Sequence, residues 1–493
     1  MSAIVLSAVA EPTVWHDVPS VTLSDQTLRQ RKARVLAQMR RHGYDTLIVY
    51  ADKEHGGNFE YLTGFIPRFE EALLVLHREG EAVLVLGNEN LKLAAFARLE
   101  NRVIHAPWFS LPNQPMSNEK SLPQLLQDAG ISSGKTLGLV GWKLFTGSAD
   151  DRSQMFDLPA FIVDAIRQAA GPQAVVVNAT AIFIAPDGGV RTVNSANELA
   201  HYEYGANLAS TAILTALNAI EPGKTEKQIG ALLTAEGQPN SVVMIAATGD
   251  RFADARLYPG DKVIRRGDKF SLTTGFKGGL SSRAAYVVGD ETELAPEVAD
   301  YLDVVAKPYF RAVVSWLENL RIGMRGGEMY DLIERVLPKA EYHWHLNPGH
   351  LVADEEWLCS PVGPDSQASI RSGMLLQIDI IPSRAGYAGA SIEDTVAVAD
   401  EALREELAEN WPALWQRIVT RRAIFASSWG LSCRRRCCRF PTPWAISVPG
   451  CWISSGPWFA RRVNRRRRSL LTVRCQEPCH TLLLNPNNGQ EDV

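Results

Sequence analysis

Two acids and one histidine in the second half of the chain are of the types that bind metal ions or move protons. Asp379 and Glu393 each interrupt an apolar run, 374–381 and 391–398, that predicts a β-strand, and His350 precedes both. Burying a lone carboxylate costs on the order of several kcal/mol. Each acid therefore needs a partner, a cation or a catalytic task.

The composition of the chain predicts an ordinary globular protein. The 493 residues are 46% apolar and 22% charged, which is enough for two or three domains with full cores. No run of 18 apolar residues occurs, so no membrane span and no membrane partner are expected. Residues 1–10 carry no lysine or arginine, which argues against a secretory signal and predicts a cytoplasmic protein.

The first half of the chain predicts an α/β domain. Apolar residues at helical spacing predict a helix over 28–42, which Gly43 closes. Short strands rich in Val, Leu and Ile are expected at 46–50, 72–76, 82–86, 137–140 and 174–178. The segment 58–65 is expected to be a loop. Residues 1–24 form an N-terminal extension and residues 25–187 the domain.

The second half predicts an α+β domain over residues 188–425. A break at 186–192 is followed by the capping box Ser195–Glu198, which opens a helix that Pro222 ends. Two strands, 270–274 and 284–288, predict a β-hairpin, and further helices lead to the strands that carry the acids.

Residues 424–493 differ from the rest of the chain. They hold eleven arginines, no lysine, three acids and six of the seven cysteines, a net charge of +8 in a chain of −4. A disulfide or zinc framework, or an arm that binds nucleic acid, could use these residue types. The cysteine spacings match no paired CxxC set and the segment lacks periodicity. We therefore predict that residues 426–493 are an irregular, disordered or out-of-frame tail, and expect no nucleic-acid partner.

Several short motifs, in order, resemble the pita-bread hydrolases, the family of creatinase, aminopeptidase P, prolidase and methionine aminopeptidase. They are Asn58 with Tyr61–Phe65, then Glu221–Glu226, Arg266–Asp268, Gly349–His350, Ser372–Met374 and Ile392–Thr395. The resemblance covers residues 25–425. It implies a creatinase-like N-terminal α/β domain, a pita-bread α+β domain and a homodimer.

The resemblance also implies five metal ligands, of which this chain keeps few. The family uses two hairpin aspartates, one histidine and two glutamates to hold two cations. Here Thr273 stands at the first aspartate, and the hairpin to Arg283 is too short to present the second. His350 and Glu393 match their ligands, and Asp379 replaces a glutamate. We therefore expect no cofactor, with a single Mn, Co or Zn ion on these three residues as the alternative.

Without a metal, the matching residues suggest an acid–base site. His350 and Glu393 would form the catalytic pair, and Asp379 would hold a substrate nitrogen. Arg256, which stands where the peptidases use another histidine, and Arg283 would clamp a substrate carboxylate. Each role has a structural alternative: Arg283 could only neutralise Asp379, and the pair could persist as a packed relic.

Three classes of function fit these residues. The first is a hydrolase of C–N bonds in a small amide, an amidino compound or a short peptide, similar to creatinase, without the two-metal centre. The second is a metallopeptidase of the Xaa-Pro aminopeptidase type with one cation. The third is a non-catalytic relative or pseudogene product, because fold can outlive activity.

Overall fold

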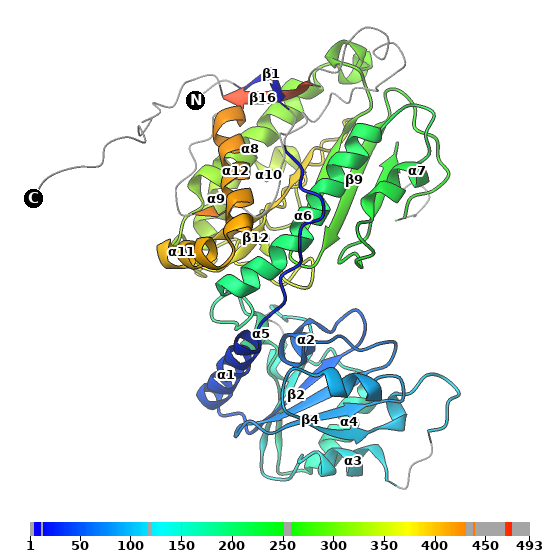
Figure 1. Cartoon of the computed structure of the whole chain (residues 1–493), viewed down its shortest axis with the longest axis vertical. Coiled ribbons are helices and arrows are strands. Elements are labelled where there is room, and N and C mark those ends of the chain that lie inside the picture. The colour runs from blue at the N-terminus through cyan, green and yellow to red at the C-terminus, as the bar shows by residue number, and fades with distance from the viewer. Residues whose placement is uncertain are drawn as a thin grey trace, which may run out of the picture.

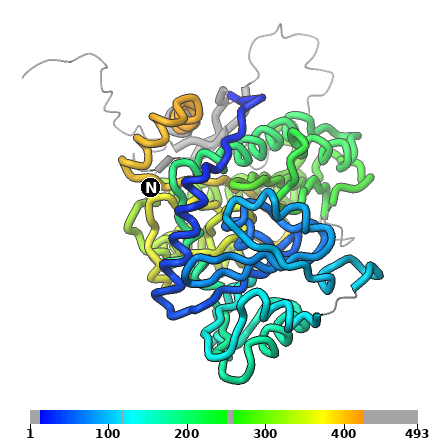
Figure 2. The backbone as a smooth tube through the Cα atoms, turned by 60° about the horizontal axis from the view of Figure 1, so that its bottom comes forward, coloured from blue at the N-terminus to red at the C-terminus, as the bar shows by residue number. Residues whose placement is uncertain are grey.

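The structure, a computed structural model, describes residues 4–10, 13–116, 120–148, 150–250, 258–429, 437–438 and 469–475. An N-terminal α/β domain and a larger C-terminal α+β domain are stacked along the long axis of the molecule (Figure 1). Figure 2 shows the same two domains, with the blue-to-cyan N-terminal one brought forward. This arrangement confirms the predicted fold class.

The N-terminal domain is built on one mixed sheet. Its strands, from edge to edge, are β5 (Arg102–His105), β4 (Ala82–Leu86), β3 (Ala72–His77), β2 (Thr46–Ala51), β6 (Thr136–Val140) and β7 (Val175–Asn178). Its α-helices are α1 (Asp25–His42), α2 (Gly57–Thr63), α3 (Leu122–Asp128), α4 (Ala160–Ala170) and α5 (Ala181–Ile184). The central strands β2, β3 and β4 are buried on both faces almost throughout, which explains their continuous apolar runs.

Local signals account well for α1. The Ser24 hydroxyl accepts a hydrogen bond from the Thr27 amide at the N-terminus, and Gly43 takes the left-handed conformation, φ 74°, at the C-terminus. The segment 58–65 differs from its prediction, because it forms helix α2 rather than a loop. Its apolar residues are buried against the sheet and against α5, a packing that short-range pattern does not reveal.

The C-terminal domain contains two four-stranded sheets. One has the order β13 (Ser391–Glu393), β10 (Gly279–Tyr286), β9 (Lys269–Phe276) and β8 (Ile245–Thr248). The other has the order β11 (His350–Leu351), β12 (Leu375–Gln377), β14 (Thr395–Val398) and β15 (Cys437–Cys438). The α-helices are α6 (Ala196–Ala219), α7 (Glu226–Gly230), α8 (Lys307–Asn319), α9 (Gly326–Val336), α10 (Lys339–Tyr342), α11 (Glu401–Asn410) and α12 (Pro412–Trp429).

Helix α6 packs closely against the predicted hairpin of β9 and β10. A Cβ atom on Gly279 would lie 2.3 Å from the Cβ of Ala206, so glycine is required for the helix and the hairpin to approach. The predicted domain boundary at 187–188 falls between α5 and α6. The capping box of α6 forms as predicted, between Ser195 and Glu198.

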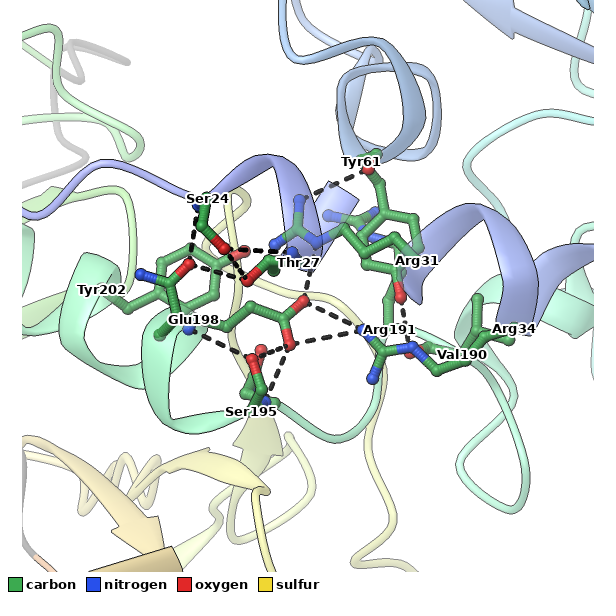
Figure 3. A network of polar contacts seen from close by, with 12 residues as sticks. Ser24, Thr27, Arg31, Arg34, Tyr61, Val190, Arg191, Ser195, Glu198 and Tyr202 are labelled. Carbon is green, nitrogen blue, oxygen red and sulfur yellow. Dashed lines mark hydrogen bonds and ion pairs between the residues drawn. The ribbon is translucent and has the colours of Figure 1, made fainter. Parts of the chain in front are cut away.

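The two domains meet where α1 crosses the start of α6 (Figure 3). The Arg31 Nε of α1 donates to Glu198 Oε1 over 2.7 Å, and both side chains are buried. Residues 13–24 run along α6 on the way to this contact, and the Val21 carbonyl oxygen lies 2.7 Å from His201 Nδ1. The N-terminal extension is therefore part of the interface.

Strand β1 (Ile4–Ala10) pairs antiparallel with β16 (Ser469–Cys475), and β15 adds to the second sheet of the C-terminal domain. Strands β15 and β16 lie in the segment for which an irregular tail is predicted. The remaining residues after 429 lie outside the described part of the chain, so that prediction stays open. Among the helices of the described residues, none is both long and apolar enough to cross a membrane.

Candidate active site

His350 lies on β11, and its ring has defined neighbours on its edge and its face. The Nδ1–H group donates to the Leu351 carbonyl oxygen over 3.2 Å, which leaves the Nε2 lone pair free in the neutral tautomer. Nε2 lies 3.6 Å from Asp379 Oδ2, and the Trp357 indole stacks on the ring with centroids 4.0 Å apart. Burial lowers the pKa of His350 to about 4, so the imidazole is neutral at pH 7.

Asp379 lies two residues beyond β12, because the strand predicted over 374–381 ends at Gln377. Its side chain is buried, and Oδ1 has no hydrogen-bond partner among the described residues. Burial, and then the charge of Glu356, raise the pKa of the Asp379 carboxyl to about 7. A buried oxygen without a partner is costly and indicates a place for a proton, a cation or a ligand.

Glu393 is the last residue of β13, and its carboxylate lies next to a group of hydroxyl side chains. Its Oε1 accepts from the Ser391 hydroxyl over 3.0 Å, and Ser391 Oγ lies 2.9 Å from Ser282 Oγ. Thr273 Oγ1 also donates to Ser282 Oγ, over 3.0 Å, so the Ser282 hydroxyl oxygen accepts from both Thr273 and Ser391. Burial, and then the charge of Asp379, raise the pKa of Glu393 well above its ordinary value.

The acid that faces the imidazole is therefore Asp379 and not, as predicted, Glu393. The strand order gives the reason. Glu393 is in register with Ser282 on β10, in the sheet that begins with β13. His350 belongs to the sheet of β11 and β12, and the chain leaves β12 next to it. The structure brings the three predicted catalytic residues into one buried region and changes their pairing.

Arg283 has a carboxylate partner in the structure that the sequence analysis did not name. Its side chain is 2% exposed, and its Nη2 donates to both carboxylate oxygens of Asp394, over 3.0 and 3.2 Å. Its Nη1 donates to the carbonyl oxygens of Ser282 and Glu393. Arg283 thus ties β10 to β13 through Asp394, and its role as a clamp for a substrate carboxylate stays a prediction. Arg256 lies outside the described residues, and its substrate-binding role stays a prediction.

Two further residues border the site, Glu356 and Trp357. Both lie on the segment that follows β11, where the sequence has the acids Asp354, Glu355 and Glu356 in a row. Burial raises the pKa of Glu356 to about 6, and its charge acts on Asp379 and Glu393. The run of acids just after the histidine was the signal that could have identified this segment.

The described side chains do not form a completed metal site. Within the ranges described above, no group of three or more His, Cys, Asp or Glu side chains is arranged to hold an ion. Thr273, where the resemblance implies the first aspartate, is paired with Ser282 across the hairpin. The hairpin therefore offers hydroxyl groups, while Glu393 lies on the neighbouring strand β13, His350 on β11 and Asp379 just beyond β12.

Two family models match this chain. Residues 200–400 match the metallopeptidase family M24, and residues 31–151 match the creatinase/prolidase N-terminal domain. A search of curated protein sequences found no match.

Solved structures of similar fold come from several organisms. The Xaa-Pro dipeptidase from Bacillus anthracis superposes with a TM-score of 0.56 at 16% identity, over 76% of this chain and 96% of its own. The prolidase from Pyrococcus horikoshii OT3 gives 0.57 at 18% identity, over 75% and 95%. The X-Pro aminopeptidase from Thermotoga maritima MSB8 gives 0.56 at 17% identity, over 75% and 95%. At these identities the likeness shows the fold.

The expectation that the protein needs no cofactor is contradicted by these matches. The matched model over 200–400 describes metallopeptidases, whose activity depends on metal ions. A divalent metal ion, the predicted alternative, is the cofactor that the match indicates. The expectation rested on the missing hairpin aspartates, which leave three of the family's five ligands, too few for two cations.

Proposed function

This chain belongs to the family of creatinase, aminopeptidase P and prolidase, and on that premise we propose that it is a metal-dependent peptidase of short peptides. The observation that carries the proposal is the buried Asp379 Oδ1, which has no hydrogen-bond partner in the described part of the chain although Oδ2 lies 3.6 Å from the Nε2 of His350. A neutral imidazole beside a carboxylate with an unmatched oxygen is a donor set that suits a divalent cation.

The residues that would hold this ion are His350, Asp379 and Glu393, whose side chains would have to close around it, because the described structure does not arrange the three as a metal site. Two carboxylates balance the charge of one divalent cation, whereas two cations need more anionic ligands than these. Because Thr273 and Ser282 offer only hydroxyl groups, we propose one cation per chain rather than two. When bound, such an ion polarises a substrate carbonyl and makes water a better nucleophile.

The chain's own residues prepare the rest of the site. Burial keeps His350 neutral, and the Leu351 carbonyl holds the ring in the tautomer with its lone pair at Nε2. The Trp357 indole covers one face of the ring and excludes water from it. The Ser391 hydroxyl orients the Glu393 carboxylate by donating to Oε1.

Xaa-Pro dipeptides are the first substrates to test, because the similar structures include an Xaa-Pro dipeptidase and prolidases. The purified protein should be dialysed against a chelator, reloaded with Mn²⁺, Co²⁺ or Zn²⁺ and assayed for metal content and for release of proline. Metal content near one ion per chain, with proline release that depends on it, is the expected result.

Variants identify the ligands. His350→Ala and Asp379→Asn should lose both the ion and the activity. Asp400→Asn is the matched control, because Asp400 caps α11 away from the site and asparagine caps a helix as well as aspartate does. Two retained ions per chain would refute the single-cation site. No retained ion and no hydrolysis would instead support the non-catalytic alternative.

A homodimer and a cytoplasmic location also remain predictions. Light scattering coupled to size-exclusion chromatography measures the first, and fractionation of the source cells the second.

A further inference from the structure

The segment 354–357 determines what covers His350. It begins three residues after the end of β11, and its last residue, Trp357, stacks on the imidazole with an interplanar angle of 17°. Trp357 is 40% exposed, so its own burial does little to hold it in place. On its C-terminal side the Leu358 amide donates to the Leu351 carbonyl oxygen over 2.9 Å, so the position of the indole depends on this contact and on how the residues before it are anchored.

Arg191, just before α6, is one anchor. Its side chain is fully buried, and it donates to both carboxylate oxygens of Glu355, over 2.7 and 2.5 Å. The same guanidinium reaches Asp354 Oδ2 over 3.3 Å and Asn58 Oδ1 over 2.8 Å. A planar guanidinium can hold two carboxylates and an amide oxygen at once, which a lysine ammonium cannot do in the same geometry.

The β9–β10 hairpin and the N-terminal domain hold the other side of the segment. Lys277 Nζ lies 3.9 Å from Asp354 Oδ1 and also pairs with Glu60 of α2. The Gly278 amide donates to the Ala353 carbonyl oxygen over 2.7 Å.

Helix α2 leaves no room for Glu355 to move toward it. A Cβ atom on Gly57 would lie 1.9 Å from Glu355 Oε1, so the backbone of α2 packs directly on this carboxylate. Contacts from both domains thus converge on two neighbouring acids, three residues or fewer from the indole.

We propose that Arg191 is a positioning residue of the site: by holding Asp354 and Glu355 it keeps Trp357 on His350, and it makes the site depend on the N-terminal domain. This proposal rests on the proposed function for its effect on cation binding and turnover. Its effect on how well His350 is covered does not depend on that function.

Arg31 provides a matched control. It is as buried as Arg191, it lies in the same interface, and it bonds a carboxylate, Glu198, over 2.7 Å (Figure 3). Its hydrogen bonds go to Glu198 and the Tyr61 carbonyl oxygen, and it acts on Asp354 only through its charge, which lysine keeps. Arg31→Lys and Arg191→Lys should therefore lose comparable stability, while only the second loosens the segment.

The first measurement is the rate at which diethyl pyrocarbonate modifies His350 in the full-length protein, followed by mass spectrometry of the peptide that contains it. Trp357→Ala, the positive reference, removes the cover. Arg191→Lys should raise the rate several-fold toward that reference, and Arg31→Lys should leave it near the wild-type value. The second measurement is the dissociation constant of Mn²⁺ by calorimetry, which Arg191→Lys should raise about tenfold, the effect typical of residues that orient a metal ligand.

The proposal would be overturned if Arg191→Lys left the His350 modification rate unchanged and lost as much stability as Arg31→Lys. Arg191 would then only stabilise the contact between the domains. If the wild-type protein binds no Mn²⁺ and cleaves no dipeptide, the proposed function fails. The modification rates would still decide whether Arg191 positions Trp357.

Discussion

A buried carboxylate shared by two arginines should dominate the attachment of the last described helix. Glu203 on α6 accepts from Arg417 Nε and Nη2, over 3.1 and 2.5 Å, and from Arg421 Nη1 over 2.8 Å. Asn207 Oδ1 accepts a further bond from Arg421, whose guanidinium lies 4.7 Å from the Trp15 ring. Two cations therefore depend on one anion in the interior.

Glu203→Gln removes the anion and leaves both guanidiniums buried. Breaking a buried ion pair by removing one partner costs about 3–5 kcal/mol, because the remaining charge is uncompensated. Burial already lowers the pKa of Arg421 to about 10 even with Glu203 present, which shows how strongly this site disfavours the cation. We expect a loss of about 3–5 kcal/mol in the free energy of unfolding, at the upper end because two cations are affected.

The matched control is Arg417→Met. It removes one of the two cations, keeps the aliphatic packing and leaves Glu203 paired with Arg421. We expect it to lower the free energy of unfolding by only about 1–2 kcal/mol. The lost charge-assisted hydrogen bonds are partly offset, because the repulsion between the two guanidiniums is removed. Urea unfolding followed by circular dichroism measures both values. A loss below about 1 kcal/mol for Glu203→Gln, or an equal loss in the two variants, would refute the charge-balance reasoning.

Two further outcomes follow from the described contacts. A chain that ends at Gly430 keeps α12 and its ion pairs, and should unfold at an equal or higher temperature than the full chain. A chain that ends before Pro412 loses this helix and should be clearly destabilised. Loss of folding on truncation at Gly430 would show that the tail is structural. His201 is partly buried, and the resulting desolvation lowers its pKa below the ordinary 6.5. The unfolded chain therefore binds the proton more readily, and stability should fall as pH drops through about 6.5. His201→Gln should flatten this fall in melting temperature between about pH 7.5 and 5, and equal slopes in the two proteins would contradict it.

The sequence by itself determined the elements whose signals are local. Spacing of apolar residues and the closing Gly43 predicted α1, and the capping box at Ser195 predicted the start of α6, because caps and helical periodicity act within a few residues. The continuous apolar runs predicted the central strands of the N-terminal sheet for the same reason. The ordered motifs also identified the family, and the buried acids Asp379 and Glu393 were recognisable from their apolar surroundings.

Only the tertiary structure decided which groups meet. Asp379 rather than Glu393 faces His350, because Asp379 follows a strand in the sheet of His350 whereas Glu393 belongs to the other sheet. That strand order depends on pairing between residues more than a hundred positions apart. Arg283 finds Asp394 through the same long-range register. The anchoring of the segment 354–357 by Arg191 depends on tertiary packing that brings together residues more than 160 positions apart in the sequence. The local sequence pattern around Arg191 or around Glu355 does not predict this contact.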